Sequence, residues 1–312
     1  MIQLDFCIIG VQKAGTTTLA AQLDGLEDVC MARPKEPMFF CYDDYVVHQK
    51  EFLHVGERWS SLQWERDQDS LLNAYQKCYS HYQEGQLIGE ASTTYAPSIL
   101  ACERLSALYP NLKVVVVLRD PIQRAVSAYW HTVRRGVATR SLENELMFGS
   151  PSYLTFGFYF EQLKRYIAAF GRENLCVIHF DDLVRDQTGT ICRLMDFLGR
   201  PISAEALGNI QNVRENRSYY PTFPRIHSMV SRTARSLKKT GKASSLGFDY
   251  GNESPSVNEN AASFYRKCFM RRKAPLPTCP RTLKMMRELF MRQNMDLDKL
   301  LGEDVFSRWN WK

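Results

Sequence analysis

A short glycine-containing segment near the amino terminus has the residue types of an anion-binding loop. It has the sequence Gly-Val-Gln-Lys-Ala-Gly-Thr-Thr-Thr over residues 10–18, between an apolar run and a segment with helical spacing. A loop of this kind turns successive backbone N–H groups toward one point, and the helix that follows adds the partial positive charge of its N-terminus. Lys13 and the threonine hydroxyls complete the cradle. The segment therefore predicts a phosphate-type anion site.

The order of residues in this loop differs from that of the common nucleoside-triphosphate loop. In the pattern G-x-x-x-x-G-K-[ST], the lysine follows the second glycine and the neighbouring hydroxyl binds magnesium. Here Lys13 precedes Gly15. We therefore expect a different anion and no requirement for a metal ion. Structural zinc is not expected either, because the nine cysteines are irregularly spaced and include no C-x-x-C pair.

A second group of polar residues covers positions 119–129, with the sequence Arg-Asp-Pro-Ile-Gln-Arg-Ala-Val-Ser-Ala-Tyr. Arg119 ends a predicted buried strand, at the edge where open α/β sheets bind ligands, and Ser127 falls two turns into the next predicted helix. The planar fork of arginine suits phosphate. Arg119 and Ser127 thus predict a second phosphate site. A strand-end arginine can instead cap a helix or form a salt bridge, and that alternative stays open.

Both groups depend on strands that lead into helices. Leu4–Gly10 is an apolar run rich in isoleucine, and Leu112–Leu118 is a near-continuous β-branched run typical of strands buried on both faces. Asp120 and Pro121 predict the start of a helix that continues through Arg135. Further strands are expected at Leu87–Glu90 and Leu175–Phe180, and further helices at residues 16–26, Ile99–Tyr109, Phe158–Phe170, Gly189–Leu198 and Thr282–Leu301. The alternation predicts an α/β fold, with a P-loop-like central parallel sheet flanked by helices.

The length and composition predict one folded domain. Of the 312 residues, 45% are hydrophobic and 24% charged, which excludes disordered and low-complexity classes. We expect a single domain over residues 1–312, with a basic amphipathic helix and a mobile loop at about 225–262. The formal net charge of +6 fits either an ordinary surface or an anionic ligand.

The sequence also favours one compartment. Its amino terminus leads directly into an apolar run too short for a signal peptide, and no apolar stretch approaches the roughly 20 residues of a membrane span. With cysteines that do not suggest disulfides, we expect a cytoplasmic protein with neither nucleic acid nor membrane as partner. The sequence does not indicate an oligomeric state.

The two motifs together resemble those of the sulfotransferases that use 3′-phosphoadenosine 5′-phosphosulfate (PAPS) and release adenosine 3′,5′-bisphosphate (PAP). The resemblance implies the sulfotransferase fold, a catalytic role for Lys13, and a 3′-phosphate site at Arg119 and Ser127. The resemblance assigns the 5′-phosphosulfate to the loop residues Gln12, Lys13, Ala14, Gly15, Thr16, Thr17 and Thr18. A third cofactor element of the family is matched loosely by Arg271, Arg272 and Lys273.

Other segments resemble the bacterial and glycan-modifying branch of the family. These are Pro34–Phe40, Gly89–Ser92, Phe197–Gly199 and Asn294–Trp309. The sequence departs from the family at two positions: Ala14 stands where glycine or serine is frequent, and Met38 stands where histidine is frequent. The methionine removes one potential contact to the acceptor.

The acceptor must lose a proton as it attacks sulfur, and Glu36 is the residue we expect to take it. In the glycan-modifying branch that this segment resembles, the matching glutamate serves as the base. Glu90 and the histidines His48 and His54 are reserve candidates, and Glu36 could instead be a surface residue paired with Lys35 or Arg33. The acceptor is expected to be a hydroxyl or amine of a small molecule, such as a natural product, or of a carbohydrate. Aromatic residues that could line its pocket or pack in the core are Phe39, Phe40, Tyr95, Phe156, Phe158 and Tyr219.

Two other functions remain to be separated from this one. A P-loop kinase or other ATP-binding enzyme would use Val114–Leu118 as its second nucleotide-binding strand and Asp120 on magnesium. A non-catalytic module for nucleotides or polyanions would use the basic stretch at 225–242. Titration with PAP, ADP and an oligonucleotide distinguishes the three.

Overall fold

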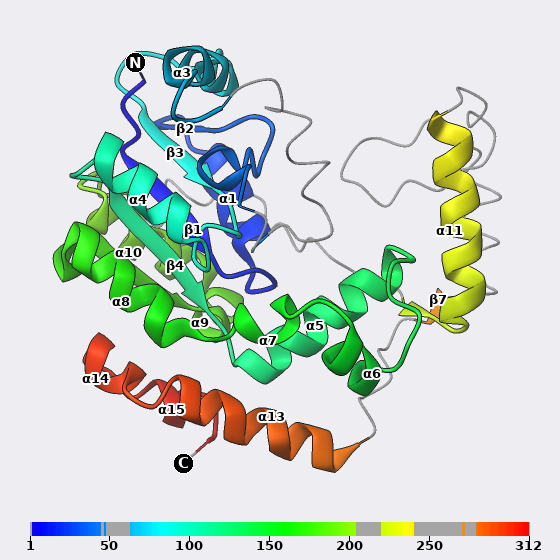
Figure 1. Cartoon of the computed structure of the whole chain (residues 1–312). Helices are drawn as coiled ribbons and strands as arrows, with labels where there is room; N and C mark the ends of the chain where they lie inside the picture. Colours follow the sequence, from blue (N-terminus) through cyan, green and yellow to red (C-terminus); the bar gives the residue numbers. More distant parts are fainter. Residues whose placement is uncertain are drawn as a thin grey trace. The chain divides into compact units, whose positions relative to one another are not determined.

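The computed structural model describes residues 2–44, 47, 63–203, 220–239, 270–271 and 279–311 (Figure 1). The chain forms two compact units. The first comprises Met1–Arg124, Leu154–Arg214 and Glu288–Lys312, and the second Ala125–Tyr153 and Glu215–Arg287. The mobile loop expected before residue 262 falls on residues 243–262, all of which lie outside the described residues.

A parallel sheet forms the centre of the first unit. Its strands are β1 (Phe6–Gly10), β2 (Val29–Met31), β3 (Leu87–Ala91), β4 (Lys113–Leu118) and β5 (Leu175–His179), in the order β2-β3-β1-β4-β5. Every residue of β1 is buried, as expected for an inner strand covered on both faces. The predicted central parallel sheet is therefore confirmed.

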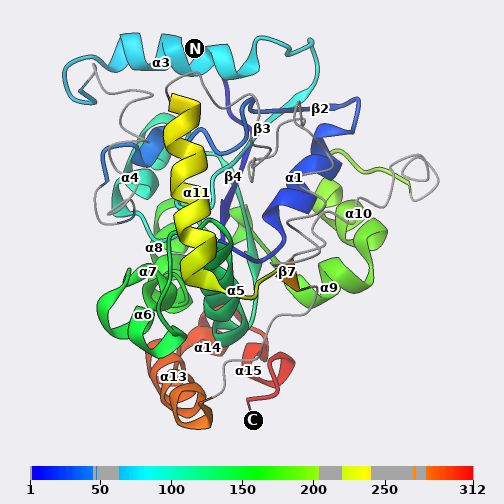
Figure 2. The same cartoon turned by 90° about the vertical axis from the view of Figure 1, so that its right-hand side faces the viewer.

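Helices cover both faces of this sheet (Figure 2). The helices α1 (Thr16–Asp24) and α10 (Gln187–Phe197) lie on one face, and α4 (Ile99–Leu108) and α8 (Tyr159–Phe170) lie on the other. Further elements of this unit are α3 (Gln68–Gln76), α9 (Phe180–Arg185), α14 (Leu297–Leu301), α15 (Val305–Arg308) and the 3₁₀ turns η1 (Phe39–Cys41), η2 (Lys77–Tyr79) and η3 (Arg172–Asn174). None of the helices in the described ranges is long and apolar enough to cross a membrane.

The prediction of one continuous helix over Thr282–Leu301 is wrong. The chain forms α13 (Pro280–Gln293) and then the separate helix α14. Asn294 lies at the break and is fully buried, and its side-chain amide donates to the carbonyl of Gly157 at 2.9 Å and accepts from the N–H of Phe160 at 3.1 Å. A side chain that bonds to a distant backbone segment offers an alternative to continuing the helix.

The second unit contains α6 (Leu142–Phe148), α11 (Pro224–Lys239) and a two-stranded antiparallel sheet of β6 (Tyr220–Pro221) and β7 (Met270–Arg271). The chain enters it within α5 (Pro121–Arg134), and α7 (Ser152–Thr155) spans its later boundary. Its buried cluster includes Tyr129, Trp130, Val133, Leu142 and Tyr153. The helix α11 covers most of the stretch for which a basic helix is expected, and its Ser228 hydroxyl donates to the carbonyl of Gly136 at 2.7 Å.

Candidate functional site

The predicted phosphate loop, residues 10–18, leaves the carboxyl end of the central strand β1 and leads into α1. Lys13 has a φ of 70° and Gly15 a φ of 87°, so both lie in the left-handed region of backbone conformations. Such a conformation is uncommon for lysine and persists where surrounding structure holds it, which is frequent at functional sites. The first turn of α1 has neither a side-chain cap nor an acidic residue. Its N–H groups are therefore suited to an anion from outside the helix.

Helix α9 restricts Gly15 to glycine. A Cβ at this position would lie 3.1 Å from Cδ2 of Leu183 and 3.3 Å from Cδ2 of Phe180, both on α9. The loop and the exit of β5 therefore pack directly against each other, and the glycine is needed both for its φ and for this close approach.

We expect Gly15→Ala to destabilise the protein more than Gly199→Ala, by about 1–3 kcal/mol in the free energy of unfolding. Gly199 also has a positive φ, of 75°, but a Cβ there would meet nothing within 4 Å. Urea unfolding gives the free energy of unfolding of each variant. Because both variants place alanine at a positive φ, the difference between their losses reports the contact with α9. Equal losses would show that α9 yields freely to the added methyl group.

The structure brings the two predicted phosphate motifs together. The Nη1 group of Arg119 donates a hydrogen bond to the carbonyl oxygen of Lys13 at 2.8 Å. The same guanidinium lies 4.3 Å from the centroid of the Phe180 ring, which places it on an aromatic face. The backbone carbonyl of Arg119 accepts from the hydroxyl of Tyr159 at 2.8 Å. Arg119 therefore links the end of β4, the phosphate loop and α9.

A second arginine adds positive charge beside the first. Arg124, in the first turn of α5, is fully buried. Its pKa is lowered to about 10, chiefly by burial; the charge of Arg119 acts in the same direction and Tyr159 in the opposite one. Two guanidinium groups that disfavour each other's charge are together stabilised by a nearby anion.

Asp120 holds the start of α5. Its Oδ1 accepts the N–H groups of Ile122 at 2.8 Å and Gln123 at 3.0 Å, and its Oδ2 accepts the indole N–H of Trp311 at 2.9 Å. Burial raises the pKa of Asp120 and these hydrogen bonds lower it. Because both oxygens already bind protein donors, the geometry does not favour the magnesium role that a kinase would require of Asp120.

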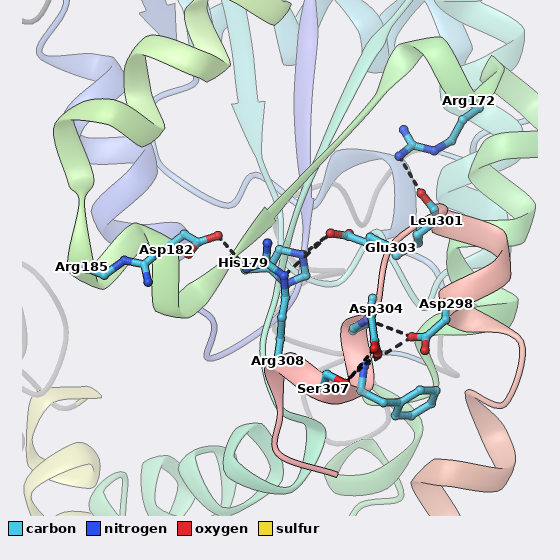
Figure 3. A network of polar contacts seen from close by, with 12 residues as sticks. Arg172, His179, Asp182, Arg185, Asp298, Leu301, Glu303, Asp304, Ser307 and Arg308 are labelled. Carbon is cyan, nitrogen blue, oxygen red and sulfur yellow. Dashed lines mark hydrogen bonds and ion pairs between the residues drawn. The ribbon is translucent and has the colours of Figure 1, made fainter. Parts of the chain in front are cut away.

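The carboxyl-terminal segment holds α9 in place (Figure 3). His179 Nε2 lies 3.0 Å from Oε2 of Glu303, and Nη1 of Arg308 donates to Oδ2 of Asp182 at 3.0 Å. The hydrogen bond from His179 is the main cause that lowers the pKa of Glu303. These two contacts bracket Phe180 in the sequence, so they hold the chain on either side of the residue whose ring lies against Arg119.

The segment of Glu36 has an unusual backbone and lies against the exit of β3. Glu36 has a φ of 55° and Met38 a φ of 54°. The Oε1 atom of Glu36 lies 2.8 Å from Nζ of Lys35 and accepts from the hydroxyl of Thr93 at 3.3 Å. The pairing with Lys35 is thus present, whereas Arg33 pairs with Asp24 at 3.1 Å. The Glu36 side chain remains 28% exposed, so the protein does not enclose it fully.

Glu90 has no exposed surface. Its carboxylate accepts hydrogen bonds from the hydroxyls of Tyr75, Tyr95 and Ser92, the last at 2.7 Å. Burial raises the pKa of Glu90, and these hydrogen bonds act in the opposite direction. A side chain enclosed in this way does not meet an acceptor, so the structure gives no support to Glu90 as the base.

The remaining predicted site residues differ in exposure. Gln12, Lys13, Thr17 and Thr18 are half-buried, whereas Ala14 and Thr16 are buried. Ser127 lies on α5, in the part of that helix that belongs to the second unit. Their roles toward a ligand stay predictions. The backbone of Arg271 lies in β7, while its side chain and the residues Arg272, Lys273, His48 and His54 lie outside the described part of the chain.

Three of the aromatic residues that could have lined an acceptor pocket pack in the core. Phe39, Phe40 and Tyr95 are fully buried, with ring centroids 4.9 Å apart for the two phenylalanines and 5.8 Å apart for Phe40 and Tyr95. Phe156 is also buried, Phe158 is half-buried, and Tyr219 lies outside the described residues.

Sequence reasoning missed the residues that support Arg119 and Asp120. Phe180 directly follows β5, the neighbour of β4. Its position after a strand could therefore have predicted that it lies at the carboxyl end of the sheet, near Arg119. Tyr159 and Trp311 carry no such signal, because the contacts that give them their roles join segments far apart in the sequence.

The family described as the sulfotransferase domain matches residues 3–219 of this chain. The match covers both phosphate motifs and the whole five-stranded sheet. The chain therefore belongs to the sulfotransferase family.

Individual relatives agree with this assignment. The mouse (Mus musculus) heparan sulfate glucosamine 3-O-sulfotransferase 3A1 is 30% identical over 200 residues, which cover 62% of this chain and 44% of the relative. The rat (Rattus norvegicus) sulfotransferase 2B1 is 30% identical over 111 residues, which cover 34% of this chain and 32% of the relative. The chain thus spans about half or less of the length of these curated relatives.

A crystal structure of a sulfotransferase from Alicyclobacillus acidocaldarius superposes with a TM-score of 0.65 at 21% identity. The superposition covers 99% of this chain and 100% of the other. The fold is therefore the sulfotransferase fold.

Proposed function

We propose that this protein transfers a sulfonate group from PAPS to a hydroxyl or amine of a carbohydrate or small-molecule acceptor and releases PAP. The observation that carries the proposal is the hydrogen bond of 2.8 Å between Arg119 and the carbonyl of Lys13. It joins the loop suited to a 5′-phosphosulfate to the residue suited to a 3′-phosphate. A nucleotide with phosphate groups at both positions satisfies both motifs, whereas ATP has no 3′-phosphate.

The residues present fit such a nucleotide. The left-handed backbone of Lys13 and Gly15 shapes a loop in front of the uncapped start of α1. A side chain at Gly15 would fill the space against α9. Arg119 and Arg124 supply positive charge at the neighbouring strand end. Anions bind favourably where backbone N–H groups and fixed cations coincide.

In the proposed mechanism, positioning and charge stabilisation do most of the work. PAPS supplies a sulfonate group bonded to a phosphate leaving group. The acceptor atom forms a bond to sulfur while the bond from sulfur to the bridging phosphate oxygen breaks, and its proton passes to the carboxylate of Glu36. Lys13 stabilises the negative charge that grows on the bridging oxygen. No metal ion has a role in these steps.

We expect Arg119→Ala to lower the affinity for PAP by about tenfold to hundredfold, the loss of one charge-assisted hydrogen bond. Isothermal titration calorimetry measures it, with ATP as the comparison ligand. Arg193→Ala is the matched control, since Arg193 is an arginine of α10 whose side chain is 62% exposed. Equal affinities of the unmodified protein for PAP and ATP, or an unchanged PAP affinity in Arg119→Ala, would contradict the 3′-phosphate site.

The activity itself is tested by transfer from [³⁵S]PAPS to a panel of acceptors. The panel contains heparan sulfate oligosaccharides, because the name of the mouse relative specifies glucosamine in heparan sulfate. It also contains a phenol, a primary alcohol and an amine. Label in any acceptor, with stoichiometric release of PAP, supports sulfonate transfer. Phosphate transfer from [γ-³²P]ATP without any sulfonate transfer would instead support the kinase.

We further propose that the protein acts in the cytoplasm, on an intermediate of natural-product biosynthesis. This proposal rests on the sequence, and cell fractionation with acceptor screening tests it.

A further inference from the structure

The buried carboxylate of Glu90 is linked to the segment of Glu36 through the hydroxyl of Ser92. This hydroxyl donates its proton to Oε1 of Glu90 at 2.7 Å. Its oxygen accepts the backbone N–H of Met38 at 3.2 Å. A single hydroxyl thus connects the carboxylate to the residue two positions after Glu36.

Tyr95, three residues after Ser92, makes a second link of the same kind. Its hydroxyl donates to the carboxylate of Glu90 and accepts the backbone N–H of Phe40 at 3.2 Å. Both hydroxyls therefore direct their protons to Glu90 and their lone pairs to backbone N–H groups of residues 38 and 40.

The segment that these two links hold is strained. Glu36 and Met38 both have left-handed backbone conformations, at φ values of 55° and 54°. Each such conformation costs of order 1–3 kcal/mol and persists only where surrounding contacts impose it. The bonds to Ser92 and Tyr95 are contacts of that kind. Thr93, which lies between them in the sequence, donates directly to the Glu36 carboxylate at 3.3 Å.

The Glu90 carboxylate, which accepts from the hydroxyls around it, is the group that sets the direction of both hydroxyls. A carboxylate only accepts hydrogen bonds, so each hydroxyl that faces it must donate and keeps its lone pairs for the backbone. A side-chain amide of the same size has two donor protons. In Glu90→Gln, one amide oxygen remains for the three hydroxyls that donate to the carboxylate, and any hydroxyl that faces the NH₂ group loses its present acceptor.

We propose that Glu90 is a positioning residue for Glu36, acting through Ser92 and Tyr95 on the backbone at Met38 and Phe40. This inference rests on the proposed function, which makes Glu36 the base. It assigns the buried carboxylate to the chemistry without any contact between Glu90 and substrate.

The test compares Glu90→Gln and Ser92→Ala with Tyr79→Phe, each alone and in a Glu36→Gln background. Tyr79 is the matched control because it is buried in the same cluster. Its hydroxyl lies 2.8 Å from that of Tyr75 and is not one of the two hydroxyls that bind the backbone at residues 38 and 40. Turnover is measured as PAP released from PAPS, once with the best acceptor of the panel and once with water as the only acceptor. Amide hydrogen exchange at Met38 and Phe40 is measured in parallel.

We expect Glu90→Gln to lower turnover by about tenfold to hundredfold, with PAP affinity within a few-fold, because displacement of a catalytic group by about 1 Å costs on the order of 10²-fold. Exchange should accelerate at Met38, at Phe40 or at both in Glu90→Gln, and at Met38 alone in Ser92→Ala. In the Glu36→Gln background, neither substitution should lower turnover further, since residues that act as a unit are not additive. Tyr79→Phe should retain turnover and exchange rates.

Additive losses in the two backgrounds, or unchanged turnover and exchange in both Glu90→Gln and Ser92→Ala, would overturn the inference. If Glu90→Gln does not fold, Ser92→Ala alone decides, because it removes one link and leaves the carboxylate in place. Full turnover in Glu36→Gln would instead overturn the assignment of the base. The positioning role would fall with it, and the exchange rates would still show whether Glu90 anchors the segment.

Discussion

Replacing Lys13 by alanine should lower kcat by about 10²–10³ and leave PAP affinity within a few-fold. The lysine charge interacts with negative charge that grows only as the bond from sulfur to the bridging oxygen breaks, so its loss affects the transition state more than bound product. The hydrogen bond from Arg119 goes to the backbone carbonyl of residue 13, which alanine retains. The variant therefore removes the ammonium group without removing the link between the two motifs.

Steady-state kinetics and calorimetry with PAP measure the two effects separately. Lys113→Ala is the matched control, because Lys113 lies at the amino end of β4, whereas the phosphate loop follows the carboxyl end of β1. Its Nζ donates to Asn174 at 2.8 Å. Near-normal turnover in Lys13→Ala would exclude the role of this lysine. A loss of PAP affinity as large as the loss of kcat would show that Lys13 contributes uniform binding instead.

The sequence predicts the parts of the fold that depend on local patterns. The runs that form β1 and β4 are almost wholly buried, and burial on both faces is what produces continuous apolar sequence in parallel strands. Asp120 forms the expected cap of α5, because capping needs only neighbouring residues. The phosphate loop follows its strand for the same local reason.

Local sequence patterns do not predict the contacts between segments that are far apart in the chain. The break at Asn294 depends on bonds to Gly157 and Phe160, and nothing in the surrounding sequence distinguishes it from a helical asparagine. Likewise, Arg119 could be expected at a sheet edge, whereas its bond to Lys13 and its place on Phe180 depend on how three strand exits pack.

Residue type alone also does not separate an acceptor pocket from a core. Phe39 and Phe40 follow Glu36 closely in the sequence, and their rings turn into a buried aromatic cluster with Tyr75 and Tyr95. That cluster encloses Glu90, and its hydroxyl groups supply two of the hydrogen bonds to this carboxylate. The aromatic residues near Glu36 thus support its segment, a role that sequence patterns do not reveal.

Glu36→Gln should lower turnover by about 10²–10⁴ and leave PAP affinity within a few-fold. Glutamine has the same size, and its carbonyl oxygen still accepts from Thr93, so the left-handed backbone of residue 36 keeps its contact with the exit of β3. What the variant loses is the capacity to take the acceptor's proton. Glutamine also removes the negative partner of Lys35, whose Nζ lies 2.8 Å from Glu36. The variant Lys35→Ala measures the effect of losing this ion pair alone.

Kinetics with the best acceptor, together with calorimetry, give both quantities. The matched control is Glu84→Gln, since Glu84 is exposed in a loop before β3. Full activity in Glu36→Gln with a loss in His48→Ala would transfer the role to a histidine. A loss in Lys35→Ala equal to that in Glu36→Gln would point to the ion pair, and not the proton transfer, as the source of the effect. The base assignment requires the carboxylate variant to lose far more than the lysine variant, because only the former removes the proton acceptor.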